Sequence, residues 1–168
     1  PRESARIDTL TARTTKLDAA LRDVQLAATA DGVLVVDTVG GLALLPDGRR
    51  VTLPATTARE RLVMDGLIRR YGHASAERVC CGQGLVDTCA ILCEADGVTA
   101  QGLDSASAVS DAALKAGHPQ ALETLNIFCA MLGSVAGNLA LTLGARGGVY
   151  VGGGIVPQIA GFFAQSAF

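Results

Sequence analysis

Apolar residues that recur every three or four positions predict helices along much of this chain. Thr57 and Glu60 form a capping box, in which the threonine hydroxyl and the glutamate carboxylate can each satisfy a free backbone amide. Ser75 can cap a short helix, which Gly82-Gln-Gly84 then breaks. The first four expected helices cover residues 16–30, 57–71, 76–79 and about 85–95. Ser105 or Ser107 starts the next, which ends at Gly117, and Pro119 suits the first turn of a long helix over residues 119–143. A last helix follows from residue 158.

Short apolar runs between these helices predict strands. Val33–Val36 contains no polar residue, which is typical of a buried strand in a parallel sheet. Val149–Val151 is a second such run, and three glycines separate it from the last helix. The turn Pro46-Asp-Gly48 and the segment Arg50–Leu53 that follows it indicate a hairpin.

The long helix over residues 119–143 is the least polar part of the chain. Residues 124–145 carry no charged side chain, so this segment belongs either to a protein core or to a bilayer. The helix contains several polar residues and lacks aromatic or basic residues at its ends, which favours a buried helix. Gly133 and Gly137 have the spacing of paired membrane helices, but in a soluble domain such glycines more often let another segment pack close.

Charge and cysteine content narrow the classes of function. The net charge of −2 gives no electrostatic reason to expect nucleic-acid binding. Residues 1–78 hold 12 of the 14 Lys and Arg residues, whereas residues 124–168 hold only Arg146. The five cysteines follow no zinc-ligand spacing, and we expect no signal peptide. Together these features predict reduced, buried thiols in a cytoplasmic protein.

Two separate segments carry the strongest indication of function. Residues 72–84 read Gly-His-Ala-Ser-Ala-Glu-Arg-Val-Cys-Cys-Gly-Gln-Gly, and residues 147–157 read Gly-Gly-Val-Tyr-Val-Gly-Gly-Gly-Ile-Val-Pro. In this order, with an uncharged helix between them, they resemble the C-terminal half of the bacterial glucokinase family. The resemblance extends over about residues 57–168 of the chain.

The first segment carries the candidate sugar-binding residue. Glu77 lies in Ser-Ala-Glu-Arg-Val, and the resemblance implies that its carboxylate accepts hydrogen bonds from hydroxyls of glucose. A carboxylate suits this task because its two oxygens can accept from neighbouring hydroxyls. The alternative is a solvated Glu77 that pairs with Arg78 or with the helix N-terminus. His73 is expected to have a structural role.

The second segment carries the candidate nucleotide-binding residues. Gly152, Gly153 and Gly154 match the family's turn at the adenosine of ATP, where the absence of a Cβ lets the backbone approach a nucleotide. Many strand-to-helix turns carry glycine for backbone reasons alone. Asp37 follows a predicted strand, as the family's catalytic base does, although an aspartate there is also a common turn former.

The resemblance implies the actin-like ATPase fold, an α/β fold with ribonuclease-H-like mixed sheets flanked by helices. Residues 1–37 would be a remnant of the small domain, and residues 38–168 the large, C-terminal domain. The implied enzyme is a glucokinase, which transfers a phosphoryl group from ATP to glucose with the help of Mg²⁺. Its partners would be glucose and ATP, with no nucleic acid and no membrane, and a homodimer is a possible assembly.

Three segments of the family are missing from this sequence: Asp-x-Gly-Gly-Thr-Asn and Gly-Thr-Gly-Leu-Gly for phosphate, and Gly-Glu-Gly-Gly-His for sugar. The chain therefore looks incomplete, and we expect these 168 residues alone to be inactive, since phosphoryl transfer depends on positioning. Two alternatives stay open. One is a non-catalytic sugar-binding relative of the family, and the other is a membrane-associated protein with an apolar C-terminal hairpin.

Overall fold

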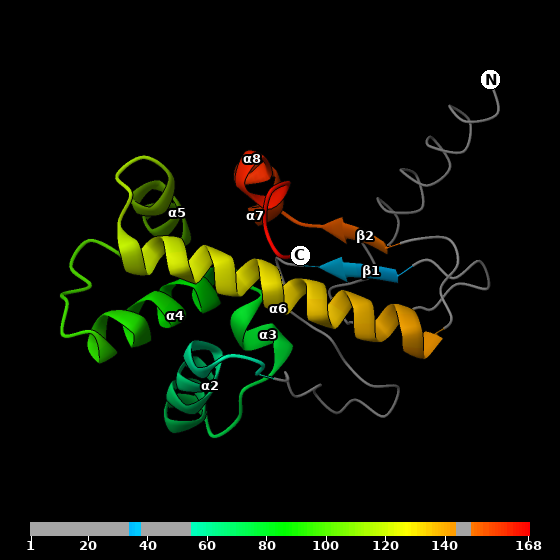
Figure 1. The fold of residues 1–168 in the computed structure, drawn as a ribbon, viewed down its shortest axis with the longest axis horizontal. Coiled ribbons are helices and arrows are strands. Elements are labelled where there is room, and N and C mark those ends of the chain that lie inside the picture. The colour runs from blue at the N-terminus through cyan, green and yellow to red at the C-terminus, as the bar shows by residue number, and fades with distance from the viewer. Residues whose placement is uncertain (1–33, 38–54, 144–148) are drawn as a thin grey trace.

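Nine helices and strands make up the part of the chain that the computed structural model describes, residues 34–37, 55–143 and 149–168. In chain order they are β1 (Leu34–Asp37), α2 (Ala58–Tyr71), α3 (Ala76–Val79), α4 (Gly82–Ala95), α5 (Ala106–Leu114), α6 (Pro119–Leu143), β2 (Val149–Gly152), α7 (Ile155–Gln158) and α8 (Ala160–Phe163). The long helix α6 crosses the molecule (Figure 1). In that view α2, α3 and α4 lie on one side of α6, and β2, α7 and α8 lie on the other (Figure 1).

Helix α2 begins at the predicted capping box. The amide of Glu60 donates to Oγ1 of Thr57 at 3.1 Å, and the amide of Thr57 donates to Oε2 of Glu60 at 3.1 Å. The amide and hydroxyl of Thr56 donate to the same Glu60 oxygen. Burial raises the pKa of Glu60, but these hydrogen bonds outweigh it and the net shift is downward. Gly72 ends the helix with a left-handed φ of 75°, as predicted.

Helices α3 and α4 differ from the prediction at their first residues. Ser75 occupies the N-cap position of α3, but its side chain makes no capping hydrogen bond, so that part of the prediction is wrong. Helix α4 already begins at Gly82, within the segment that was expected to separate the two helices. The thiol of Cys81 supplies the cap, because its sulfur accepts from the amide of Gly84 at 3.3 Å.

The next two helices follow the predicted pattern. The hydroxyl of Ser105 caps α5 by accepting from the amide of Ala108 at 3.2 Å. Helix α5 ends at Leu114, a few residues before Gly117, which has a left-handed φ of 66°. Helix α6 begins at Pro119, a position where the missing amide is tolerated because the first turn has no partner for it.

The core lies around the first two-thirds of α6. Helices α4 and α5 pack directly against it, and α3 also contacts it. The buried residues of α6 form one broad side of the helix, whereas Leu122 is exposed. Side chains less than 2% exposed include Leu67, Leu85, Leu92, Val109, Leu125, Phe128, Met131 and Leu132.

The two described strands form a parallel pair, as the apolar run before Asp37 predicted. Leu34 lies opposite Val149, and Asp37 lies opposite Gly152. The strands come from opposite ends of the described chain, with helices α2 to α6 between them. The predicted helix over residues 16–30 and the predicted hairpin at residues 46–53 lie outside the described residues.

Helix α6 is the segment whose sequence could be taken for a membrane-spanning helix. Its residues Pro119–Thr142 have the length and hydropathy of a membrane span, yet half of that window is buried inside the protein. A Cβ at Gly133 would lie 2.7 Å from the backbone of Phe168, so glycine there lets another segment pack close, as predicted. Gly137 has no atom within 4 Å of the corresponding position, so the same reason does not apply to it.

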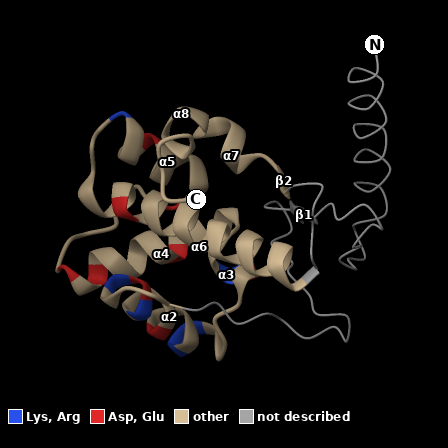
Figure 2. Cartoon of the chain, turned by 45° about the vertical axis from the view of Figure 1, so that its right-hand side comes forward, with Lys and Arg blue, Asp and Glu red and all other residues tan. Residues whose placement is uncertain are grey.

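Charged side chains are distributed unevenly over this fold. They gather on α2, on the ends of α4 and α5, and at the beginning of α6 (Figure 2). From residue 124 onward the described part of the chain carries none, so β2, α7, α8 and most of α6 are drawn in tan (Figure 2). Leu141 is 84% exposed within this uncharged region.

Candidate functional site

The three candidate nucleotide-binding glycines lie where β2 ends and α7 begins. Gly152 is the last residue of β2, and Gly154 is the residue before α7. Gly153 has a φ of 102°, a conformation that a residue with a side chain rarely adopts. Gly154 is exposed, and a Cβ built on it would meet no atom within 4 Å. The turn therefore presents backbone without side chains over it.

Asp37, the candidate base, is brought beside this turn by the backbone of the sheet. It is the last residue of β1 and its Cα is the register partner of Gly152. The carboxyl ends of parallel strands meet at one edge of a sheet, where ligands bind in many α/β proteins. Sequence reasoning did not pair the two positions, because more than a hundred residues separate them.

Glu77, the candidate sugar-binding residue, lies on the one-turn helix α3 and is half-buried. Its neighbours Ala76 and Val79 are buried and fix which side of α3 faces the core. The alternative interpretation paired Glu77 with Arg78. In the structure the guanidinium of Arg78 lies over the ring of Tyr71, with 4.2 Å between its central carbon and the ring centroid.

Glu77 and the glycine turn lie on different elements, on opposite sides of α6. Helix α3 lies on one side of α6 and the turn between β2 and α7 lies on the other, in both views (Figures 1 and 2). Helix α3 packs against α6, and β1, the partner of β2, also contacts α6. One long helix therefore connects the two candidate segments.

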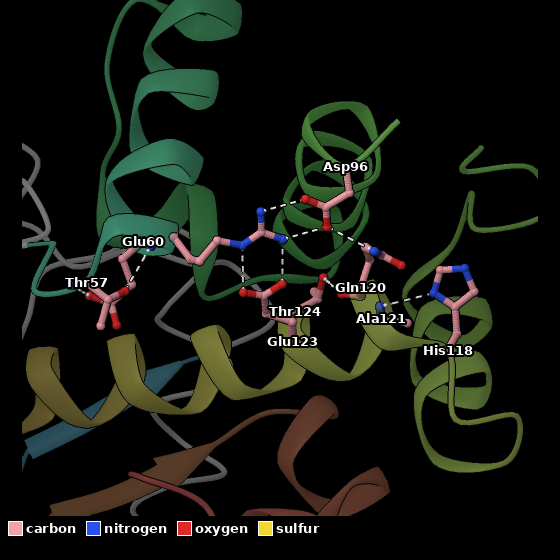
Figure 3. A network of polar contacts seen from close by, with 9 residues as sticks. Thr57, Glu60, Asp96, His118, Gln120, Ala121, Glu123 and Thr124 are labelled. Atoms are coloured by element: carbon pink, nitrogen blue, oxygen red, sulfur yellow. Dashed lines mark hydrogen bonds and ion pairs between the residues drawn. The ribbon is translucent and has the colours of Figure 1, made fainter. Parts of the chain in front are cut away.

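A polar network that the sequence did not indicate joins three helices near the start of α2 (Figure 3). Arg59 donates to both oxygens of Asp96 at 2.8 Å and to both oxygens of Glu123 at 2.8 and 2.6 Å. Gln120 also donates to Asp96, at 2.9 Å. The hydrogen bonds from Arg59 lower the pKa of Asp96 to about 2. This network holds α2, the end of α4 and the beginning of α6 in register.

The cysteines are free thiols, and four of the five are buried, as the composition predicted. Burial raises the pKa of Cys80 to about 12 and that of Cys89 to about 11. Thiols with such pKa values are poor nucleophiles and poor metal ligands at neutral pH. Among the described residues, no cluster of three or more His, Cys, Asp or Glu side chains is placed to hold a metal ion.

Comparison with solved structures defines the class of protein. A glucokinase from an Antarctic psychrotroph superposes with a TM-score of 0.71 and 29% identity, over 84% of this chain and 48% of that one. A glucokinase from Balamuthia mandrillaris, solved in complex with glucose, gives a TM-score of 0.56 at 18% identity, over 81% of this chain and 44% of that one. The fold is therefore that of the actin-like ATPases, as the resemblance implied.

Sequence comparison identifies the family. The family model for glucokinase matches residues 30–168, and the chain belongs to the glucokinase family. The glucokinase of Chromobacterium violaceum is 47% identical over 135 residues, which are 80% of this chain and 38% of that protein. The glucokinase of Aromatoleum aromaticum is 47% identical over 122 residues, or 73% of this chain and 37% of that protein. The chain thus spans about two-fifths of the length of these relatives.

Proposed function

We propose that the protein transfers the terminal phosphoryl group of ATP to glucose, giving glucose 6-phosphate and ADP. The observation that supports this most is the family match over residues 30–168, because that range includes Asp37, Glu77 and the glycine turn. Membership of this family favours neither of the alternatives, a non-catalytic sugar-binding relative or a membrane-associated protein.

Glu77 binds the sugar in this proposal. Its carboxylate accepts hydrogen bonds from two neighbouring hydroxyls of glucose, and such charge-assisted hydrogen bonds are stronger than neutral ones. The half-buried position of Glu77 on α3 supports this role, because partial burial strengthens an electrostatic contact while one face stays accessible.

The glycine turn binds ATP in this proposal. The positive φ of Gly153 and the open space at Gly154 fit a turn against which a nucleotide can pack closely. Mg²⁺ would accompany the phosphates of ATP and neutralise their charge during transfer. We assign no residue to Mg²⁺, because the described residues contain no cluster suited to hold it.

Asp37 accepts the proton of the attacking hydroxyl in this proposal. Its place at the carboxyl end of β1, in register with Gly152, supports the role, since the acceptor must lie near the transferred phosphoryl group.

We retain the division into a small-domain remnant, residues 1–37, and a large domain, residues 38–168. Closure of two such domains would exclude water, the competing acceptor. We also propose that the enzyme acts in the cytoplasm, without nucleic acid or membrane.

The test is a coupled glucose-phosphorylation assay on the protein at its natural length, with Glu77→Gln as the variant. Loss of the charge and of one acceptor oxygen should lower glucose affinity by roughly ten- to a hundred-fold and leave the KM for ATP nearly unchanged. The matched control is Glu94→Gln, the same change at an exposed position on α4, which should leave both constants unchanged.

Deoxy sugars sharpen this assay. A glucose analogue that lacks the hydroxyl bound by Glu77 should have almost equal affinity for Glu77→Gln and for the parent. Unchanged glucose kinetics in a folded Glu77→Gln variant would contradict the sugar contact. A parent that phosphorylates no hexose would overturn the proposed reaction itself.

A further inference from the structure

Helix α3, which carries Glu77, depends on its neighbours for its orientation. It has only four residues, and a single helical turn is unstable by itself because nucleation fixes several dihedral angles for one hydrogen bond. Ser75 contributes no capping hydrogen bond from its side chain. The direction in which Glu77 points must therefore be set by contacts between α3 and the surrounding helices.

A buried carboxylate on α4 organises these contacts. Asp87 is only 7% exposed and accepts hydrogen bonds from three side chains. The hydroxyl of Tyr71 donates to one of its oxygens at 2.8 Å, and Arg70 and Gln83 donate to the other at 3.2 and 3.4 Å. Tyr71 and Arg70 are the last residues of α2, so Asp87 fixes the end of α2 against α4. The pKa of Tyr71 is raised, mainly by its hydrogen bond to Asp87 and also by burial.

Tyr71 in turn holds α3. The guanidinium of Arg78 lies over its ring at 4.2 Å, which is the geometry of a cation–π contact. From α4, a Cβ at Gly84 would lie 2.5 Å from the carbonyl oxygen of Arg78 and still closer to that of Val79. Helix α3 is thus held by a side-chain contact from α2 and by direct backbone packing on α4.

We propose that Tyr71, anchored by Asp87, is a positioning residue that fixes α3 through Arg78 and thereby directs Glu77 toward the sugar. The inference rests on the proposed sugar contact of Glu77. Tyr71 does not touch the substrate in this arrangement, and its effect passes through the orientation of one helical turn.

Loss of the Tyr71 ring should change the KM for glucose more than any other kinetic constant. Without the Tyr71 ring, α3 would sample several orientations, and only the fraction with Glu77 correctly placed would bind glucose. The apparent affinity falls by that fraction, whereas saturating glucose selects the competent orientation again. The KM for glucose should therefore rise while kcat and the KM for ATP stay within about two-fold of the parent values.

Two substitutions of Tyr71, made in the protein at its natural length, should raise the KM for glucose to different extents. Tyr71→Leu removes the ring and the hydroxyl, and should raise the KM for glucose by about ten-fold. Tyr71→Phe keeps the ring beneath Arg78 but loses the anchor to Asp87, and should raise this KM by about two- to three-fold. The control is Arg59→Gln, which breaks another connection between α2 and α4, far from α3 in sequence, and should leave the KM for glucose unchanged.

A double-variant cycle separates positioning from general destabilisation. If Tyr71 acts through Glu77, the variant with both Tyr71→Leu and Glu77→Gln should have nearly the KM for glucose of Glu77→Gln alone. Hydrogen exchange should also show faster exchange in residues 76–80 of Tyr71→Leu and unchanged exchange there in Arg59→Gln.

Each outcome decides the proposal. Additive effects of the two substitutions on KM, or parental exchange in residues 76–80 of Tyr71→Leu, would overturn it. A rise in the KM for glucose in Arg59→Gln as large as in Tyr71→Leu would show a general loosening instead. If Glu77→Gln alone leaves glucose affinity unchanged, the proposed sugar contact fails, and the exchange measurement then decides by itself whether Tyr71 holds α3.

Discussion

Substitution of Gly84 by alanine tests the close packing of α3 on α4. A Cβ at this position would lie 2.5 Å from the carbonyl oxygen of Arg78 and closer still to that of Val79, whereas ordinary contacts begin near 3.4 Å. Both neighbours are backbone atoms, which cannot turn aside as a flexible side chain can. Helix α4 would have to move away from α3 by roughly 1 Å, and overpacking of this kind costs about 1–3 kcal/mol.

The helix propensity of alanine offsets part of this cost. Alanine is favoured over glycine by up to about 1 kcal/mol inside a helix and by less in the first turn. We therefore expect Gly84→Ala to lower the free energy of unfolding by about 1–2 kcal/mol. Because α3 carries Glu77, the same displacement should raise the KM for glucose in the proposed reaction.

Gly82→Ala is a closely matched control, two residues earlier in the same turn of α4. A Cβ there would lie 3.6 Å from the Cβ of Ala106, which is ordinary van der Waals contact. We expect this variant to be as stable as the parent or up to about 1 kcal/mol more stable. Urea unfolding followed by far-ultraviolet circular dichroism measures both variants, and equal m-values make the midpoints comparable. A Gly84→Ala protein at least as stable as Gly82→Ala would refute the reasoning.

Two further predictions concern the glycine turn and the thiols. Gly153→Val should weaken ATP binding and leave glucose binding nearly intact, because a β-branched residue is strained at a φ of 102° and covers the turn. Titrations with ATP and with glucose measure this, and an equal loss of affinity for the two ligands would indicate a folding defect instead. Thiol titration without reductant should find all five cysteines after denaturation. In the folded protein Cys80 and Cys89 should react slowly, since burial raises the pKa of each thiol. Three or fewer thiols in the denatured protein would contradict the prediction of reduced cysteines.

Local signals in the sequence predicted helices α2, α5 and α6 well, whereas the single helix expected from residue 158 was wrong, because two short helices, α7 and α8, occupy that region. The capping box at Thr57, the cap at Ser105 and the proline at the start of α6 each act within a few residues, so their effect can be read from neighbouring positions. The sequence was misleading at Ser75 and Gly82. A serine before a helix usually caps it, but here the thiol of Cys81 caps the next helix and the glycines begin it.

Contacts between distant residues were beyond sequence reasoning. Arg59 meets Asp96 and Glu123 across 37 and 64 positions, and no spacing rule connects them. The same holds for Asp87, whose donors Arg70 and Tyr71 come from another helix. Only the packing of α2 against α4 and the beginning of α6 creates these pairs. The candidate residues Glu77 and Gly153 were found because whole segments resemble a family, and a lone glutamate or glycine would have given no such signal.

The uncharged stretch after residue 123 follows from the position of α6. Helices α3, α4 and α5 and strand β1 contact this helix, so a charged side chain on its buried side would lose its water without gaining a partner. Glu123 is the last charged residue before this stretch. It lies at the edge of the core, where Arg59 can reach it from α2. The two candidate binding segments lie on opposite sides of this same helix (Figures 1 and 2). A helix that supports both must be long and must bury one apolar side, and these two requirements together favour the apolar pattern that also resembles a membrane span.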